Sequence, residues 1–147
     1  MTTVSAATWI DAPPATVWAV LTGLSRYPDW NPLFLAAAGD LAVGQRITLR
    51  RAPGGGFPAL IRPRVTALTP DSELSWERRL PGLICGVHRF TLKNGNGGTL
   101  VLQSLTFHGI MARFSGRALD RAEANLEALS AALKAHCEAH RVHDDTT

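Results

Sequence analysis

The stretch TLVLQSLTFHGIMARFSGRALDRAEANLEALSAALKAHCEAH, residues 99–140, contains the change of hydrophobic period that decides the fold. Up to Phe107, apolar and polar residues follow the loose period of two that is typical of a strand. After Gly109 the apolar residues are spaced alternately three and four apart. They are Leu119, Ala122, Leu126, Leu129 and Leu133. This spacing predicts one long helix of about 28–30 residues with a single apolar stripe.

Upstream of this stretch, turn signals divide the chain into short segments of strand-like alternation. The segments are FLAAA (34–38), QRITLRR (45–51), LIRPRVTAL (60–68), ELSWERRL (73–80), VHRFTLK (87–93) and TLVLQSLTF (99–107). Glycine-rich and proline-containing links of turn length separate them, as in NGNGG at 94–98. Six strands in succession predict an antiparallel meander.

The first 33 residues predict one more strand and two short helices. VSAATWI (4–10) is rich in β-formers, and DAPPATVWAVLTGL (11–24) has Asp11 as a candidate N-cap followed by prolines suited to a first helical turn. RYPDW then allows about one further helical turn. We therefore expect an α+β fold in which a curved seven-stranded antiparallel sheet wraps around a long C-terminal helix. We expect one domain over residues 1–140 and a flexible tail at 141–147.

Composition limits the function. The 147 residues are 46% hydrophobic and 18% charged, with a formal net charge of +3. The cationic residues are scattered and do not alternate with aromatics, so no nucleic-acid partner is expected. No apolar stretch approaches the roughly 20 residues that span a bilayer, so we expect no stable membrane insertion. The start lacks signal-peptide features, and only Cys85 and Cys137 are present. These features favour a reduced, cytoplasmic protein, with a homodimer left open.

Three segments carry a resemblance to a known family. They are IDAPPATVWAVLTGLSRYPDWNPL (10–33), LSWERRLPGLICGVHRFTL (74–92) and GGTLVLQSLTFHG (97–109). Over roughly residues 4–136 the chain resembles the START-like, or helix-grip, superfamily, and within it the bacterial polyketide cyclase/dehydrase and lipid-transport group. The resemblance implies an apolar cavity between sheet and helix that holds a lipid, polyketide or other hydrophobic molecule. It implies no cofactor.

The aromatic and proline-rich segment SRYPDWNPL (25–33) can be structural or functional. The resemblance implies a joint between the second short helix and the next strand, in which Tyr27 and Trp30 pack the end of the sheet and the prolines fix the direction of the chain. The alternative is that Trp30 contacts the ligand.

Strand alternation predicts which side chains face the cavity. On the middle strands the predicted inward residues are Trp76 and Arg78, then His88 and Phe90, because the residues that alternate with them are polar. These are Glu73, Ser75, Glu77 and Arg79 on the first strand and Arg89, Thr91 and Lys93 on the second. On the last strand both alternating sets are mixed, and the resemblance favours Gln103, Leu105 and Phe107. Met111 and Phe114, one helical turn inside the entrance, complete the predicted ligand-binding set.

No catalytic residue is predicted. His88 can act as an acid or base near neutral pH, but no Ser, Cys or carboxylate has a spacing that pairs with it. Many relatives carry a Glu where this chain has Leu105, so an acid-base mechanism that depends on that Glu is in doubt. No metal is expected, because His136, Cys137 and His140 have no second ligand set. Arg78 can meet a ligand carboxylate or phenolate, or it can reach solvent.

The predicted entrance lies at one end of the meander, where three connections are unusually apolar. Alternate connections of an up-and-down meander share an end, which places residues 52–59, 80–85 and 108–110 together. Their apolar members are Phe57, Leu80, Leu83, Ile84 and Ile110. Since loops normally face water, apolar tips suggest a mouth for a hydrophobic ligand.

Three classes of function remain open. The leading hypothesis is a protein that binds or carries a hydrophobic small molecule. The alternative is a cyclase/dehydratase-type enzyme in which His88 or Arg78 moves or stabilises charge. The third is an interaction module with a collapsed cavity.

Overall fold

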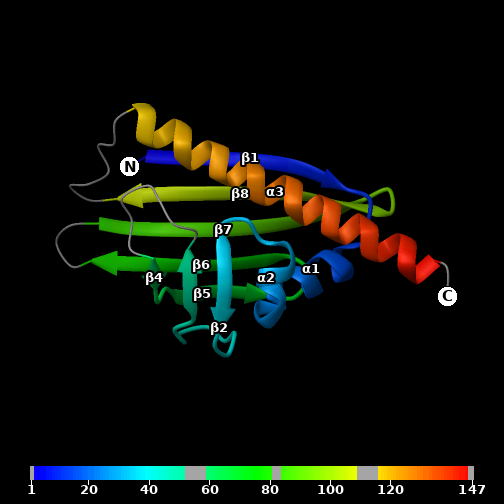
Figure 1. The fold of residues 1–147 in the computed structure, drawn as a ribbon, viewed down its shortest axis with the longest axis horizontal. Helices are drawn as coiled ribbons and strands as arrows, with labels where there is room; N and C mark the ends of the chain where they lie inside the picture. The colour runs from blue at the N-terminus through cyan, green and yellow to red at the C-terminus, as the bar shows by residue number, and fades with distance from the viewer. Residues whose placement is uncertain (1, 52–58, 81–83, 109–115, 146–147) are drawn as a thin grey trace.

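A computed structural model of the chain describes residues 2–51, 59–80, 84–108 and 116–145. The elements are β1 (Thr2–Ile10), α1 (Pro14–Thr22), a 3-10 turn η1 (Leu24–Arg26), α2 (Tyr27–Trp30), β2 (Phe34–Ala38), β3 (Thr48–Arg51), β4 (Leu60–Ile61), β5 (Arg64–Thr69), β6 (Glu73–Leu80), β7 (Ile84–Gly95), β8 (Gly98–His108) and α3 (Gly116–Asp145). Figure 1 shows α3 lying across one face of the long strands, with α1 and α2 beside it. The predicted helix-grip α+β class is confirmed.

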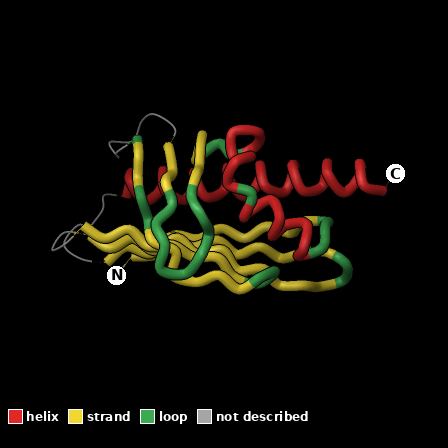
Figure 2. The backbone as a smooth tube through the Cα atoms, turned by 90° about the horizontal axis from the view of Figure 1, so that it is seen from below, coloured by secondary structure: helices red, strands yellow, loops and turns green. Residues whose placement is uncertain are grey.

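The strands form two sheets, whereas a single seven-stranded sheet was predicted. The described residues contain a five-stranded sheet, in the order β1-β8-β7-β6-β5, and a three-stranded sheet, in the order β2-β3-β4. Every named strand pairing is antiparallel. Figure 2 shows the long strands as one layer, α3 as a second layer, and the three short strands rising beside them.

The additional strand arises at Pro63. The segment 60–68, predicted as one strand, divides into β4 and β5 around Arg62 and Pro63, because proline has no N–H to give to a ladder. The two sheets remain joined here, since Ile47 N donates to Pro63 O at 3.0 Å and Val65 N donates to Gln45 O at 2.9 Å. The wall of strands is therefore continuous and bends at this point.

The long hairpin β7–β8 supplies the centre of the large sheet. Its pairing runs from Cys85↔His108 to Gly95↔Gly98. Asn96 and Gly97 form the two-residue turn, with φ of 50° and 79°. Positive φ at both central positions is the geometry that two-residue hairpins favour, and Asn-Gly adopts it readily. The NGNGG segment thus turns the chain as predicted.

Helix α3 covers this sheet with the predicted apolar stripe. Leu126, Leu129 and Leu133 are fully buried, and Cys137 continues the stripe one turn later. Leu119 and Ala122 are half-buried. The helix continues to Asp145, so the segment expected to be a tail from residue 141 is helical through that residue.

The start of α1 differs from the expected cap at Asp11. The N-cap is Pro13, whose extended backbone (φ −67°, ψ 156°) precedes Pro14 in the first helical turn, and no side chain caps the helix. Thr16 N and Val17 N both donate to Pro13 O. The consecutive prolines set the helix start two residues later than an Asp11 cap would.

The segment around Trp30 packs against the core and also against α3. The Trp30 ring stacks on His136 of α3, with centroids 6.0 Å apart and an interplanar angle of 21°. Tyr27 is buried, meets the edge of Trp30 at 5.4 Å, and donates its hydroxyl to Leu21 O at 2.6 Å. The joint therefore ties α2 to α1 and α3.

Asn31 directs the chain from α2 into β2. Its buried side-chain Oδ1 accepts from Leu33 N at 2.9 Å and from Phe34 N at 2.8 Å. These bonds satisfy two backbone donors where the helix ends. Asn31 thus fixes the entry of Phe34 into the interior.

We expect Asn31→Ala to lower the free energy of unfolding by about 1–3 kcal/mol, because it leaves backbone donors without their acceptor. Urea denaturation measures this loss. Asn31→Asp, which keeps the acceptor oxygen, should recover most of it, and Asn94→Ala at an exposed position serves as the control. An Asn31→Ala variant as stable as the parent would contradict this role.

Candidate functional site

The sheet directs the predicted side chains towards α3. On β6 and β7, Trp76, His88 and Phe90 are buried, as is Gln103 on β8. Register places Trp76 opposite His88 and Phe90 opposite Gln103, so the four side chains form one continuous patch on the inner face. The predicted inward orientation is observed, and contact with a ligand remains a prediction.

The inward side chains differ in exposure along the strands. On β6, Leu74 and Trp76 are 0% and 3% exposed, whereas Arg78 is half-buried. On β8, Val101 and Gln103 are buried and Leu105 is half-buried. Phe107, the next inward residue on β8, is 9% exposed. Arg78 and Leu105 are thus the half-buried inward residues of these two strands, whereas Phe107, nearer the end of β8, is buried again.

Aromatic rings surround His88. Phe90 stacks on the imidazole with centroids 4.5 Å apart, and Trp76 meets it edge-on at 5.4 Å. Phe34, which comes from β2 in the smaller sheet, lies 6.2 Å from His88 and 6.0 Å from Trp76. Both sheets thus contribute to one aromatic wall, and such pairs stabilise beyond their buried area.

A chain of hydrogen bonds crosses from this wall to the helix. His88 Nε2 and Gln103 Oε1 are 2.8 Å apart. Gln103 Nε2 donates to Ser130 Oγ at 2.8 Å and to Leu126 O at 3.2 Å. Because the Gln103 amide nitrogen faces α3, its oxygen faces His88, and His88 Nε2 must carry the proton. One side chain therefore connects the sheet to two residues of the helix.

His88 is held neutral in this environment. Its pKa is lowered to about 4, mainly by burial and also by the charge of Arg51, while the hydrogen bond with Gln103 acts in the opposite direction. Desolvation disfavours the charged imidazolium, which explains the sign. At neutral pH the ring is thus a hydrogen-bond donor through Nε2 and carries no charge.

Two arginines point inward beside the aromatic wall. Arg78 follows Trp76 by two residues on β6, and Arg51 pairs with Phe34 across β2 and β3. Both side chains are half-buried. Burial and the charge of Arg78 lower the pKa of Arg51, so the two guanidinium groups interact. The end of the interior that holds them is cationic.

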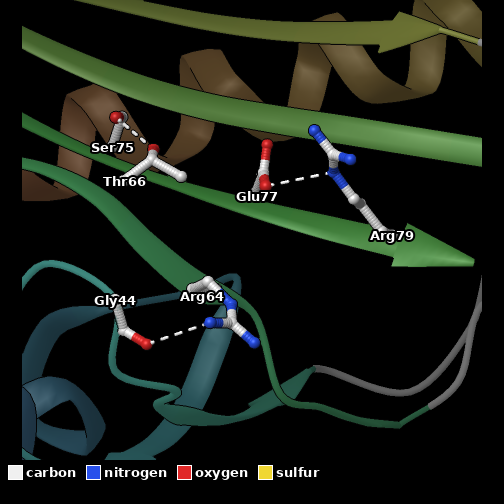
Figure 3. A network of polar contacts seen from close by, with 6 residues as sticks. All are labelled: Gly44, Arg64, Thr66, Ser75, Glu77 and Arg79. Atoms are coloured by element: carbon white, nitrogen blue, oxygen red, sulfur yellow. Dashed lines mark hydrogen bonds and ion pairs between the residues drawn. The ribbon is translucent and has the colours of Figure 1, made fainter.

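The outer face of the same strands shows the opposite arrangement. Glu77 accepts from Arg79 at 3.1 Å, and Figure 3 shows this pair and the 2.7 Å Thr66–Ser75 contact on the face away from α3. Arg89 pairs with Glu73 at 3.0 Å. Among the described residues no carboxylate lies within ion-pair distance of Arg78.

The outer face also carries a shallow depression of about 410 Å³. Its lining consists of small and medium residues of β1, β7 and β8. They are Ser5, Ala6, Ala7, Thr91, Leu102, Gln103 and Ser104. Since Leu102 and Ser104 alternate with the inward Gln103, this depression is separate from the predicted interior site.

Several predicted residues lie outside the described part of the chain. They are Phe57, Leu83, Ile110, Met111 and Phe114. Leu80 and Ile84 pair with each other at the ends of β6 and β7, but their side chains are not described. The predicted entrance therefore stays a prediction.

Three contributors to the site were not predicted from the sequence. Phe34 and Arg51 belong to segments recognised as strands, but nothing local indicated that the smaller sheet folds against Trp76 and His88. Ser130 did carry a signal, since it follows Leu126 by four residues and Leu129 by one. A polar residue within an apolar helical stripe marks a candidate partner for a buried polar group.

The described residues contain no group of three or more His, Cys, Asp or Glu side chains placed to hold a metal. His136, considered for such a role, stacks on Trp30. Cys137 is buried, and desolvation raises the pKa of its thiol to about 12. No helix in the described ranges is long and apolar enough to cross a membrane.

Fold and site geometry define a helix-grip protein with an aromatic and cationic interior. The family described as polyketide cyclase / dehydrase and lipid transport matches residues 1–138. The chain belongs to this family, which confirms the resemblance seen in the sequence. No curated protein shows significant sequence similarity to the chain.

Solved structures agree on the fold. A START superfamily protein from Mycobacterium smegmatis matches with a TM-score of 0.74 and 18% identity, over 93% of this chain and 97% of its own. Protein MLL2253 from Mesorhizobium loti matches with a TM-score of 0.69 and 22% identity, over 90% and 94%. DynU16, from the dynemicin biosynthetic locus, matches with a TM-score of 0.73 and 17% identity, over 92% of this chain and 47% of its own.

The depressed pKa of His88 predicts acid sensitivity. In the unfolded state His88 takes up a proton near pH 6.5, and in the folded state only near pH 4. The contribution of neutral His88 to the free energy of unfolding is therefore fully present above pH 6.5 and is lost as the pH decreases towards 4. The shift corresponds to about 3 kcal/mol.

Urea denaturation of the parent and of His88→Gln at pH 7.5 and pH 4.5 tests this assignment. Glutamine can still donate to Gln103 but does not titrate. The variant should lose clearly less stability than the parent over this interval. Equal losses in the two proteins would show that His88 does not titrate as described.

Proposed function

We propose that the chain binds or carries a hydrophobic small molecule, lipid- or polyketide-like, between the large sheet and α3. The observation that carries the proposal is the aromatic wall of Phe34, Trp76, His88 and Phe90, which faces the helix. Aromatic surfaces with a few convergent polar groups are typical of small-molecule sites. The family description, which includes lipid transport, supports the same class of ligand.

The state of the polar groups favours binding over proton-transfer chemistry. His88 is neutral, with its Nε2 proton directed to Gln103. The Gln103 amide does not ionise, and Ser130 accepts from that amide. An imidazole with a pKa near 4 is a weak base at neutral pH. These groups serve the architecture of the interior.

The half-buried state of Arg78 on β6 and of Leu105 on β8 supports an opening beside these two residues. We propose that the ligand enters there, beside the expected entrance residues. Leu105 lies opposite both His88 and Val4 in the register, so a larger side chain at this position would occupy space next to the aromatic wall.

A cyclase/dehydratase-type activity is the second candidate. The family description includes it, and the charge of Arg51 acts on His88, so a developing negative charge on a bound chain would meet cationic groups. A His88→Gln variant that kept ligand affinity but lost turnover of an identified substrate would favour this candidate over a carrier.

Native mass spectrometry of freshly purified protein tests the binding proposal. We expect a retained molecule of small, fixed mass at one per chain. Leu105→Trp should abolish retention by filling the interior, whereas Leu102→Trp, on the opposite face of β8, should preserve it. Thermal melting identifies any variant that has lost its fold.

Two results would contradict the proposal. One is protein that carries no ligand and shows no chemical-shift changes when lipids or aromatic polyketides are added. The other is retention that survives Leu105→Trp in a folded protein, which would place the ligand elsewhere.

A further inference from the structure

The arginines of the interior show how the ligand is recognised at its polar end. Arg78 shares the inner face of β6 with Leu74 and Trp76. Inward alternation on β3 likewise places Arg51 with the fully buried Leu49. Both arginine side chains thus project from sheet surfaces that are otherwise apolar.

Charge on the two faces of β6 is distributed unequally. The outward Arg79 has Glu77 as partner, and the outward Arg89 on β7 has Glu73. Both acidic residues of β6 therefore form their ion pairs on the outer face. Within the described residues Arg78 has no carboxylate partner, and its charge interacts with the like charge of Arg51.

Arg78 is half-buried beside an apolar surface and has no carboxylate partner among the described residues, which favours a counter-ion at this position. Partial desolvation of a guanidinium is costly unless an anion compensates it. Arginine also recognises carboxylate and phosphate through paired N–H donors. The neighbouring wall, in which Trp76 meets His88 and Phe34 edge-on, offers an apolar surface beside Arg78.

We infer that the ligand is an amphipathic acid, whose anionic head group lies at Arg78 and whose apolar body lies along the aromatic wall. The inference rests on the proposed function and specifies its ligand class. It orients the molecule, since the apolar body points towards the Gln103 end of the interior and the head group towards the exposed end of β6.

Isothermal titration calorimetry at pH 8 with decanoate and 1-decanol tests the inference. The two probes have the same chain and differ in the charge of the head group, and His88 stays neutral at this pH. We expect the parent to bind decanoate at least tenfold more tightly than decanol.

Variants of neighbouring arginines then locate the effect. Arg78→Met should reduce decanoate affinity at least tenfold and leave decanol affinity within about twofold. Arg78→Lys should recover part of the loss, because it restores the charge without the planar fork. Arg79→Met, one residue away on the outer face, should leave both affinities unchanged.

The outcomes separate this inference from the proposed function. Equal binding of both probes, unchanged by Arg78→Met, would overturn the anionic head group and leave hydrophobic binding intact. Equal losses of both probes in Arg78→Met with an unchanged melting temperature would also overturn it. Binding of neither probe would overturn the amphipathic acid, while native mass spectrometry decides the proposed function independently.

Discussion

The buried amide of Gln103 is the constraint on which the interior depends. It is buried between a sheet and a helix, where an unpaired polar group costs about 1–3 kcal/mol. Its oxygen meets His88, and its nitrogen reaches Ser130 and the carbonyl of Leu126. All three contacts can form together only at one rotation of α3 about its axis and one distance of α3 from β8. Apolar burial of Leu126, Leu129 and Leu133 holds the helix to the sheet, and the amide selects its position.

This constraint also shapes the proposed chemistry. Because Gln103 fixes His88 through Nε2, the imidazole stays in the plane that lets Phe90 stack on it and Trp76 meet its edge. Burial keeps the ring neutral, although the hydrogen bond with Gln103 acts against this effect. The interior thus presents a rigid aromatic surface, while its free charge lies at the exposed end on Arg78. A site of this kind favours selection of a ligand by shape and head group.

The sequence predicted the layers of the fold because they depend on periodic patterns. The change of period after Phe107 predicted α3, and alternation on β6 and β7 placed Trp76 and His88 on the inner face. The sequence-based prediction was wrong or incomplete where a non-local contact or a proline determined the structure. Pro63 split a predicted strand, and the approach of Phe34 to Trp76 depends on how two sheets fold together. The role of Gln103 needed Ser130, which lies 27 residues away, and no local pattern joins them.

A double-mutant cycle on His88→Phe and Gln103→Met tests the central claim most directly. Each single variant leaves one buried polar group without its partner, whereas the double variant removes both groups and keeps similar volume. Urea denaturation at pH 7.5 should give a double variant less destabilised than the sum of the singles, with a coupling energy of about 1–2 kcal/mol. Strictly additive losses would show that the pair is energetically independent, and that Gln103 does not organise the interior through His88.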